Sequence, residues 1–286
     1  MSIRLVDTHS HLNFVDYDSD LKEVILRAKK AGVSKIIVLS SEHVSAQRAV
    51  EISQKYLHIY AAIGVHPLYL TGAGSLFTED GSPQGFYTKS DDQPVNIFYI
   101  KDFEELLRNA EVKAIGEVGL DYFESADREN PINRELQMEV LEKMLNLAVK
   151  FKKPAIVHLR TSKKSTDAFD DFLEIVNRLD KKPKVVVHCF SGDKVIAKKL
   201  LDAGFYISFT NLTFYSEKTK EAFIKIPLSN VMLETDSPFL SPKKDVKRNE
   251  PAFLKDVAQK LADLRNMSLE ELAAITTKNA EEFFGI

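Results

Sequence analysis

Eight short runs of apolar, mostly β-branched residues recur along the chain, and segments with helical spacing separate them. The runs are Ile3–Val6, Lys35–Leu39, Ile59–Ile63, Glu111–Glu117, Pro154–His158, Lys184–His188, Phe205–Phe209 and Val231–Asp236. Continuous Val and Ile runs are typical of parallel strands that are buried on both faces. The pattern therefore predicts eight parallel strands.

Helices are predicted between these strands. The expected ranges are Asp20–Ala31, Val44–Tyr56, Tyr99–Ala110, Arg134–Lys150, Asp167–Leu179, Lys194–Ala203, Glu217–Ile226 and Pro251–Leu264, with a capping box at Ser268 and Glu271 opening one more. Alternation of this kind over about 250 residues predicts a TIM-type (β/α)8 barrel, an α/β fold that forms one domain over residues 1–286. A doubly wound open sheet is the structural alternative. It is less favoured because no Gly-x-Gly-x-x-Gly follows a strand.

One connection is too long for a simple turn. Residues 71–98, after the third strand, are rich in Gly, Ser and Asp and poor in apolar residues. Irregular loops longer than about 12–15 residues are uncommon and are functional or disordered. We expect an inserted loop over the carboxyl-terminal face of the barrel, either as a mobile insertion or as a lid over the substrate.

Composition excludes several classes of protein. The single Cys189 excludes an internal disulfide framework, and no apolar run approaches the ~20 residues needed to span a bilayer. No secretory signal is visible, so a cytoplasmic location is expected, or a nuclear one if the source is eukaryotic. The net charge of −3 excludes a strongly basic coat for nucleic acid, so contact with phosphates requires a local patch or a metal. We expect a monomer with no membrane contact and no obligate protein partner.

Metal-type side chains follow the predicted strands. Five of the seven histidines lie at strand ends, together with two acidic residues: His9, His11, His66, Glu117, His158, His188 and Asp236. In a barrel of this type, polar residues at the carboxyl ends of different strands converge on one mouth. Such a set suits divalent Zn, Mn, Mg, Co or Ni. Six ligands exceed what one tetrahedral ion requires, so two ions that share a carboxylate are the natural interpretation. Two such metals can activate water and stabilise a leaving oxygen in phosphoester cleavage.

Taken together, the motifs resemble one family. They are Asp7-Thr8-His9-x-His11, Gly64-Val65-His66-Pro67, Gly116-Glu117-Val118-Gly119-Leu120-Asp121-Tyr122, His158, His188, Glu234-Thr235-Asp236-Ser237-Pro238 and Arg248-Asn249-x-Pro251. The set is similar to that of the TatD family of metal-dependent hydrolases, which are amidohydrolase-like barrels, and it spans nearly the whole chain. The resemblance implies a TIM-type barrel, a site for two divalent metals and deoxyribonuclease activity, typically a 3′–5′ exonuclease on DNA and sometimes on RNA.

The resemblance also implies a role for each residue of the site. His9, His11, Glu117 and Asp236 would hold one metal, and Glu117 would bridge to a second metal on His158 and His188. Asp236 would orient or deprotonate the attacking water. His66 would face the substrate, either contacting the scissile phosphate or supporting the ligands, and Arg248 and Asn249 would be further substrate contacts. Apart from the resemblance, Arg160 follows the fifth strand on the same face and could neutralise a phosphate. The insertion at 71–98 is longer than in compact bacterial members, which puts substrate access in question.

Two other functions compete with a nuclease. The same metal site could hydrolyse an ester or amide, as in a small-molecule amidohydrolase or an aminoacyl-tRNA deacylase. Related barrels that act on amides often bridge their metals with a modified lysine, whereas this chain supplies Glu117, and basic loops around Arg160 and Arg248 favour a phosphate-bearing substrate. A non-catalytic metal-binding scaffold is the third hypothesis.

Overall fold

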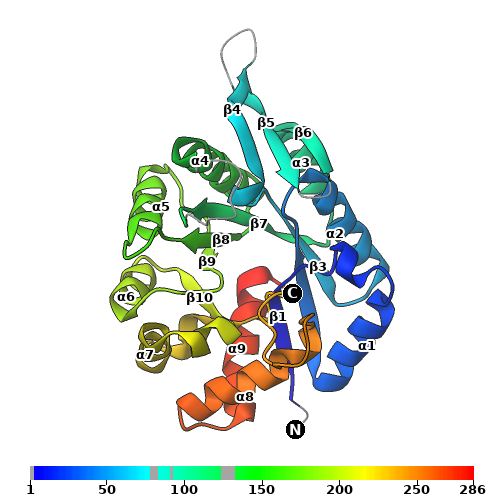
Figure 1. Cartoon of the computed structure of the whole chain (residues 1–286), viewed down its shortest axis with the longest axis vertical. Helices are drawn as coiled ribbons and strands as arrows, with labels where there is room; N and C mark the ends of the chain where they lie inside the picture. Colours follow the sequence, from blue (N-terminus) through cyan, green and yellow to red (C-terminus); the bar gives the residue numbers. More distant parts are fainter. Residues whose placement is uncertain (1–2, 78–82, 91–92, 124–132) are drawn as a thin grey trace.

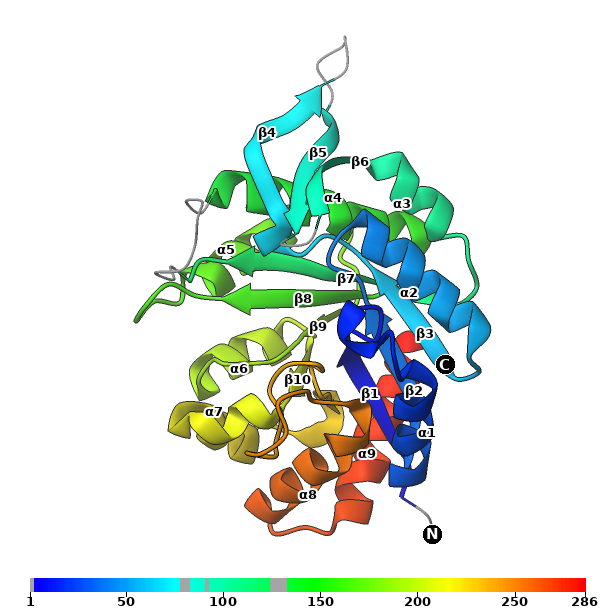
Figure 2. The same ribbon diagram turned by 45° about the vertical axis from the view of Figure 1, so that its right-hand side comes forward.

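All eight predicted strands are present and pair in parallel around a common axis (Figures 1 and 2). The structure, a computed structural model, describes residues 3–77, 83–90, 93–123 and 133–286, and within 71–98 it describes only the backbone. The barrel strands are β1 (Leu5–Ser10), β2 (Val33–Leu39), β3 (Ile59–Ile63), β7 (Val112–Asp121), β8 (Ala155–Arg160), β9 (Val185–Val187), β10 (Tyr206–Phe209) and β11 (Val231–Leu233). Their spatial order follows the chain, β1-β2-β3-β7-β8-β9-β10-β11. This is the predicted (β/α)8 barrel in one domain, and the open doubly wound sheet was the wrong alternative.

The barrel closes between β1 and the segment that follows β11. Asp236 N donates to His9 O at 2.9 Å, and His11 N donates to Ser237 O at 2.7 Å. The buried carboxylate of Asp7 accepts from Thr235 N at 2.9 Å and from Thr235 Oγ1 at 2.6 Å. The two ends of the barrel sheet are therefore joined at the level where His9 and Asp236 emerge.

Helices surround the strands in the order that the sequence predicts. They are α1 (Leu21–Ala31), α2 (His43–Lys55), α3 (Ile100–Leu106), α4 (Arg134–Phe151), α5 (Asp167–Arg178), α6 (Lys194–Asp202), α7 (Glu217–Lys225), α8 (Leu254–Leu264) and α9 (Leu269–Phe284). Short 3₁₀ turns lie at Val15–Tyr17, Pro67–Tyr69, Asn211–Tyr215, Leu228–Asn230 and Pro251–Phe253. The predicted capping box at Ser268 and Glu271 opens α9. Among the described residues, none of the helices is both long and apolar enough to cross a membrane.

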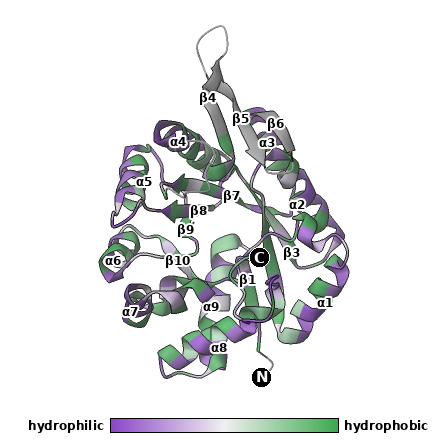
Figure 3. Ribbon diagram, in the orientation of Figure 1, coloured by the Kyte–Doolittle hydropathy of each residue, from purple (hydrophilic) through white to green (hydrophobic). Residues whose placement is uncertain are grey.

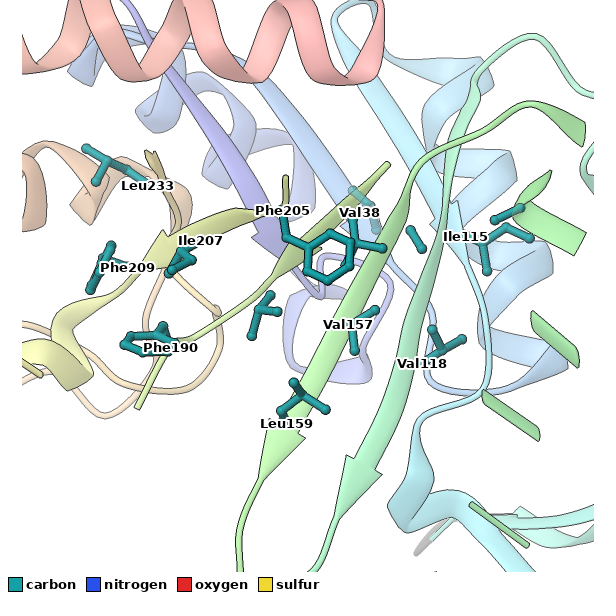
Figure 4. Packing of buried hydrophobic residues seen from close by; sticks show 14 of the residues in the cluster. Val38, Ile115, Val118, Val157, Leu159, Phe190, Phe205, Ile207, Phe209 and Leu233 are labelled. Carbon is teal, nitrogen blue, oxygen red and sulfur yellow. The ribbon is translucent and has the colours of Figure 1, made fainter. Parts of the chain in front are cut away.

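The apolar side chains form two layers, as expected for strands buried on both faces. The larger layer lies between the strands and the surrounding helices, and Figure 4 shows part of it around Val157, Phe190 and Phe209. Figure 3 shows mostly hydrophobic strands inside a ring of helices that alternate hydrophobic and hydrophilic residues. The smaller layer fills the barrel interior with residues that include Ile156 and Val186, and α9 adds Phe283 and Phe284 to it. The interior of the barrel is therefore packed with apolar side chains, which form a floor below the carboxyl ends of the strands. The polar side chains lie above this floor, at the mouth of the barrel.

The insertion lies after β3, where the sequence predicts it, but its described backbone is not irregular. It forms a separate antiparallel sheet of β4 (Leu70–Phe77), β5 (Pro83–Ser90) and β6 (Gln93–Tyr99), which projects from the barrel (Figure 2). Residues 78–82 and 91–92 of the expected loop lie outside the described residues. The predicted insertion after the third strand is confirmed, and the strand pairing within it was not predicted because its Gly, Ser and Asp content hid the pairing pattern. A role as a lid stays a prediction.

Candidate metal centre

Strand alternation brings the predicted ligands to the barrel mouth. On β8, Ile156 lies in the interior floor and Val157 in the outer layer, so His158, two residues beyond Ile156, points into the mouth. His188 follows Val186 in the same way at the end of β9. Glu117 arrives from β7 and is 3% exposed. All six predicted metal residues thus meet around the side chain of Glu117.

His9, His11 and Asp236 form the first cluster. The Nε2 atoms of His9 and His11 lie 3.2 Å apart. Glu117 Oε2 lies 3.2 Å from the first and 3.6 Å from the second, and Asp236 Oδ1 lies 3.6 and 3.7 Å from the same two nitrogens. Four donor atoms from distant parts of the chain therefore enclose one point.

The second cluster lies on the other oxygen of the same carboxylate. Glu117 Oε1 lies 3.1 Å from His158 Nδ1 and 2.7 Å from His188 Nε2, and these two nitrogens are 3.1 Å apart. Glu117 therefore divides the centre, with one oxygen in each cluster. A bridging carboxylate between two cations requires this arrangement.

The spacing of the donor atoms suits divalent cations. Bonds of about 2.0–2.1 Å to a tetrahedral ion place its ligand atoms ~3.3 Å apart. Separations within the two clusters run from 2.7 to 3.7 Å. Imidazole nitrogens with carboxylate oxygens suit the borderline and hard ions named above. The residues present therefore fit metal binding, and the structure brings the six predicted side chains together; their role as metal ligands stays a prediction.

Polar groups behind three imidazoles orient each ring so that its other nitrogen faces the cation site. His11 Nδ1 faces the carbonyl of Leu39 at 3.2 Å, so it carries the proton and Nε2 keeps its lone pair. His158 Nε2 faces Asp121 Oδ2 at 3.1 Å, and His188 Nδ1 faces an oxygen of Glu234 at 3.4 Å. In each case the other ring nitrogen points toward Glu117. Carboxylates and carbonyls behind histidine ligands orient them in this way in metal sites.

His66 has the opposite polarity. Its Nδ1 accepts a hydrogen bond from Leu68 N at 3.1 Å, so the neutral ring carries its proton on Nε2. That Nε2 lies 3.3 Å from Glu117 Oε1. His66 therefore points a hydrogen-bond donor, not a lone pair, at the centre. This agrees with its predicted place outside the ligand set, in a position to face substrate oxygens.

Burial sets the protonation states of the centre. It lowers the pKa of His11 to about 3, assisted by the neighbouring His9, whose own pKa it also lowers. Burial would raise the pKa of Glu117, but His188 and the other imidazoles hold it well below its usual value. His9, His11 and Glu117 thus take the neutral imidazole and ionised carboxylate forms that bind cations. Against the effect of burial, Asp121 and Glu117 raise the pKa of His158, and Glu117 raises the pKa of His188 well above its usual value, so a cation has to displace a proton from each ring. Burial raises the pKa of Asp236 to about 8, against the opposing effect of His188, and a bound cation would lower it.

Glu234 and Asp121 stand behind the ligands, and the sequence interpretation gave them no role. Both Glu234 oxygens accept strong hydrogen bonds, from Cys189 N at 2.6 Å and from Ser208 Oγ at 2.5 Å, which leaves it as a fixed support for His188. The signal for Glu234 was present in the sequence. Met232 lies in the interior floor, so alternation places Glu234, two residues beyond it, in the mouth.

A glycine allows β7 to approach β8 beside the second cluster. Gly119 pairs with His158 and has φ of 153°, and a Cβ there would lie 1.9 Å from His158 O. No side chain fits in that space. Gly119 is therefore required at this position, because the close approach of its backbone to His158 brings His158 near Glu117.

Arg160 lies where a substrate contact was predicted. Its side chain is 50% exposed, its Nη1 is 4.0 Å from Asp121 Oδ2, and its guanidinium stacks 4.0 Å above the Phe123 ring. The group is therefore held beside the second cluster with much of its surface open. An exposed guanidinium here can bind a phosphate through two hydrogen bonds.

The predicted substrate contacts Arg248 and Asn249 are both engaged within the protein. Burial of Asn249 corrects its expected contact with substrate, whereas a contact by Arg248 stays a prediction. Arg248 forms a two-pronged ion pair with Asp20, at 2.7 Å for both contacts. Asn249 is fully buried, and its side-chain amide donates to Thr235 O at 2.9 Å and to Phe239 O at 2.6 Å. Asn249 thus holds both sides of Asp236 in place. Asn249 of the Arg-Asn-x-Pro segment therefore supports the loop after β11.

We predict that Asn249→Ala lowers the free energy of unfolding by about 1–3 kcal/mol, the cost of a buried acceptor left unpaired. Urea denaturation measures this change. Asn177→Ala, at an exposed position on α5, is the matched control and should cost less. If Asn249→Ala leaves stability unchanged and raises KM, the result would instead support a direct contact between Asn249 and the substrate.

Comparison with known proteins places the chain among metal-dependent hydrolases. The family model described as "TatD related DNase" matches residues 6–285. A relative from Bacillus subtilis (strain 168), "Uncharacterized metal-dependent hydrolase YabD", is 37% identical over 286 residues, which is 99% of each chain. "Putative deoxyribonuclease TATDN3" of Mus musculus is 31% identical over 288 residues, covering 99% of this chain and 89% of that protein.

A solved structure agrees with the fold over the full length. The crystal structure of YJJV, a TatD homologue from Escherichia coli K12, superposes with a TM-score of 0.79 at 28% sequence identity, and each chain is covered completely. The barrel and the order of its elements are therefore those of a known hydrolase architecture.

Proposed function

This chain belongs to the family of TatD-related DNases, and from that premise we propose that it is a phosphodiester hydrolase that removes nucleotides from the 3′ end of single-stranded or frayed DNA, and also acts on RNA. Metal-dependent hydrolysis is common to its relatives. The exonuclease mode and the 3′ polarity come from the family resemblance and form part of the proposal. Nucleic acid is the proposed partner, bound by a monomer.

One observation carries the proposal, which is the division of Glu117 between two clusters. Its Oε2 faces His9 and its Oε1 faces His188, at 3.2 and 2.7 Å. We propose that this carboxylate bridges two divalent cations per subunit, drawn from Mg, Mn, Zn, Co and Ni. When bound, such cations supply Lewis-acid stabilisation of phosphoryl charge and lower the pKa of water.

The protein's own groups would complete the reaction. Asp236 lies at the edge of the first cluster and is the proposed acceptor for the proton of the attacking water. His66 aims its Nε2 proton into the centre and would donate it in a hydrogen bond to a phosphate oxygen. Arg160 would hold a neighbouring phosphate, because its guanidinium is exposed beside the second cluster.

The test is a panel of substrates against a panel of metals. Single-stranded DNA labelled at the 3′ or the 5′ end, a blunt duplex and single-stranded RNA are incubated with protein that has been stripped by chelator and reloaded with each metal. We expect stepwise shortening from the 3′ end with reloaded protein and none with stripped protein. Carboxylic esters and amides form the other arm. Hydrolysis of those alone, with every oligonucleotide intact, would replace the nuclease assignment with an acyl hydrolase.

A further inference from the structure

An aromatic corner lies against the first metal cluster and has no role in the proposed chemistry. Phe14, after β1, stacks on the His11 ring at 4.6 Å between centroids and 23° between planes. Phe239, after β11, stands edge to face against both, 6.1 Å from His11 at 72° and 6.2 Å from Phe14 at 81°. The two phenyl rings thus extend the wall of the metal centre outward.

Hydrogen bonds fix the backbone of Phe239, although the residue is exposed to solvent. It is 52% exposed. Its backbone N donates to Asp236 O at 2.9 Å, and its backbone O accepts from the Asn249 amide at 2.6 Å. Single exposed apolar residues are ordinary on protein surfaces. Phe239 differs because its backbone is hydrogen-bonded to that of Asp236 and its ring packs edge to face against His11, which places the ring beside the first cluster.

A nucleobase is the occupant that fits this corner. A flat, open aromatic ring adjoining a phosphodiester-cleaving centre is in reach of the base on the nucleotide being cleaved. Stacking on a phenyl ring tolerates any base, because every base has a π face. A base within a duplex is already paired and stacked, so only an unpaired end can enter. The chain has a net charge of −3, so it lacks the strongly basic surface that binds nucleic acid in other proteins. Base stacking would then supply part of the binding affinity.

We propose that Phe239, backed by Phe14, is a stacking subsite for the unpaired 3′-terminal base of the substrate. This rests on the proposed nuclease function and adds to it the source of its preference for single-stranded ends. Recognition is of the base plane and not of base identity, so the subsite accepts purines and pyrimidines.

Fluorescence tests the subsite without turnover. The chain contains no tryptophan, so Phe239→Trp introduces a single indole at the corner. The metal-loaded variant is titrated with dAMP and with deoxyribose 5-phosphate, which carries the same phosphate but no base. We expect saturable quenching by dAMP only. Leu57→Trp is the matched control, because Leu57 is 90% exposed just before β3, at the opposite end of the barrel, and should not respond.

Kinetics provide the second readout. Wild-type protein is compared on two single-stranded oligonucleotides that differ only in having a base or an abasic sugar at the 3′ end. We expect kcat/KM to favour the base by about 5- to 150-fold, the factor that corresponds to stacking on an aromatic ring. Phe239→Ala should bring this ratio toward one, whereas Leu57→Ala should keep it.

The outcomes separate the two proposals. Wild-type degradation of oligonucleotides without dAMP quenching in Phe239→Trp, or with the base preference intact in Phe239→Ala, overturns the subsite and leaves the nuclease standing. Quenching by dAMP in a protein that degrades no oligonucleotide with any metal supports base stacking on Phe239 but removes the nuclease assignment and, with it, the 3′-terminal base as the occupant. If Phe239 instead binds a protein partner, neither dAMP nor deoxyribose 5-phosphate should change the fluorescence of Phe239→Trp. That result also overturns the subsite.

Discussion

Glu117→Gln is expected to reduce turnover of a single-stranded oligonucleotide by at least ~10³-fold while the barrel stays folded. Metal charge supplies several kcal/mol of transition-state stabilisation, and each 1.36 kcal/mol is a tenfold change in rate. Glutamine keeps the shape of the side chain but removes the charge that faces both clusters. Both metals should therefore be lost, and elemental analysis of the purified variant measures this directly.

Circular dichroism and the melting temperature show whether the barrel is intact. Glu174→Gln is the matched control, because that side chain on α5 is 63% exposed and should change neither activity nor metal content. A Glu117→Gln protein that retains two metals per chain and full activity would contradict the bridging arrangement. Loss of one metal alone would place Glu117 in a single cluster.

The barrel could be predicted because each strand carries its own local signal. Runs such as Ile36–Leu39 and Val185–Val187 are apolar throughout, as is typical of strands buried on both faces, and the observed β2 and β9 contain them. Strand ends were less predictable. The run from Val231 was expected to continue to Asp236, but β11 ends at Leu233 and the chain turns at Asp236, whose φ is 54°. The turn depends on hydrogen bonds from β1, which no local pattern contains.

The ligand set could also be predicted, because the fold brings the ends of parallel strands together. The roles of the residues behind the ligands could not, although strand alternation places Glu234 in the mouth. Asp121 acts through a hydrogen bond to His158 and Glu234 faces His188 Nδ1, and the direction of a ring is invisible in the sequence. Asn249 shows the same limit in reverse. Its place in a motif suggested substrate, whereas burial and two carbonyl partners make it a support for the loop that carries Asp236.

The division of the centre also predicts that ligands on its two sides are not equivalent. Asp236 faces only the first cluster, through His9 and His11 at 3.6 and 3.7 Å, whereas the second cluster contains Glu117, His158 and His188. Asp236→Asn should therefore weaken one metal and leave the other. Elemental analysis should give about one metal per chain, in contrast to the loss of both in Glu117→Gln. Turnover should fall by about 10²- to 10⁴-fold, because a positioned proton acceptor contributes that much.

Asp245→Asn is the matched control, because Asp245 is an exposed aspartate in the same connection after β11 and should leave metal content and rate unchanged. The stability of Asp236→Asn should stay close to that of the wild type, since Asp236 N donates to His9 O and Asp236 O accepts from Phe239 N through the backbone alone. Loss of both metals on this substitution would mean that the clusters form one cooperative site. Full turnover with one metal missing would show that another group accepts the proton and that Asp236 acts only as a ligand. We expect neither of these results. Because the two oxygens of Glu117 face different clusters, Asp236→Asn should lose activity and one metal and keep the other.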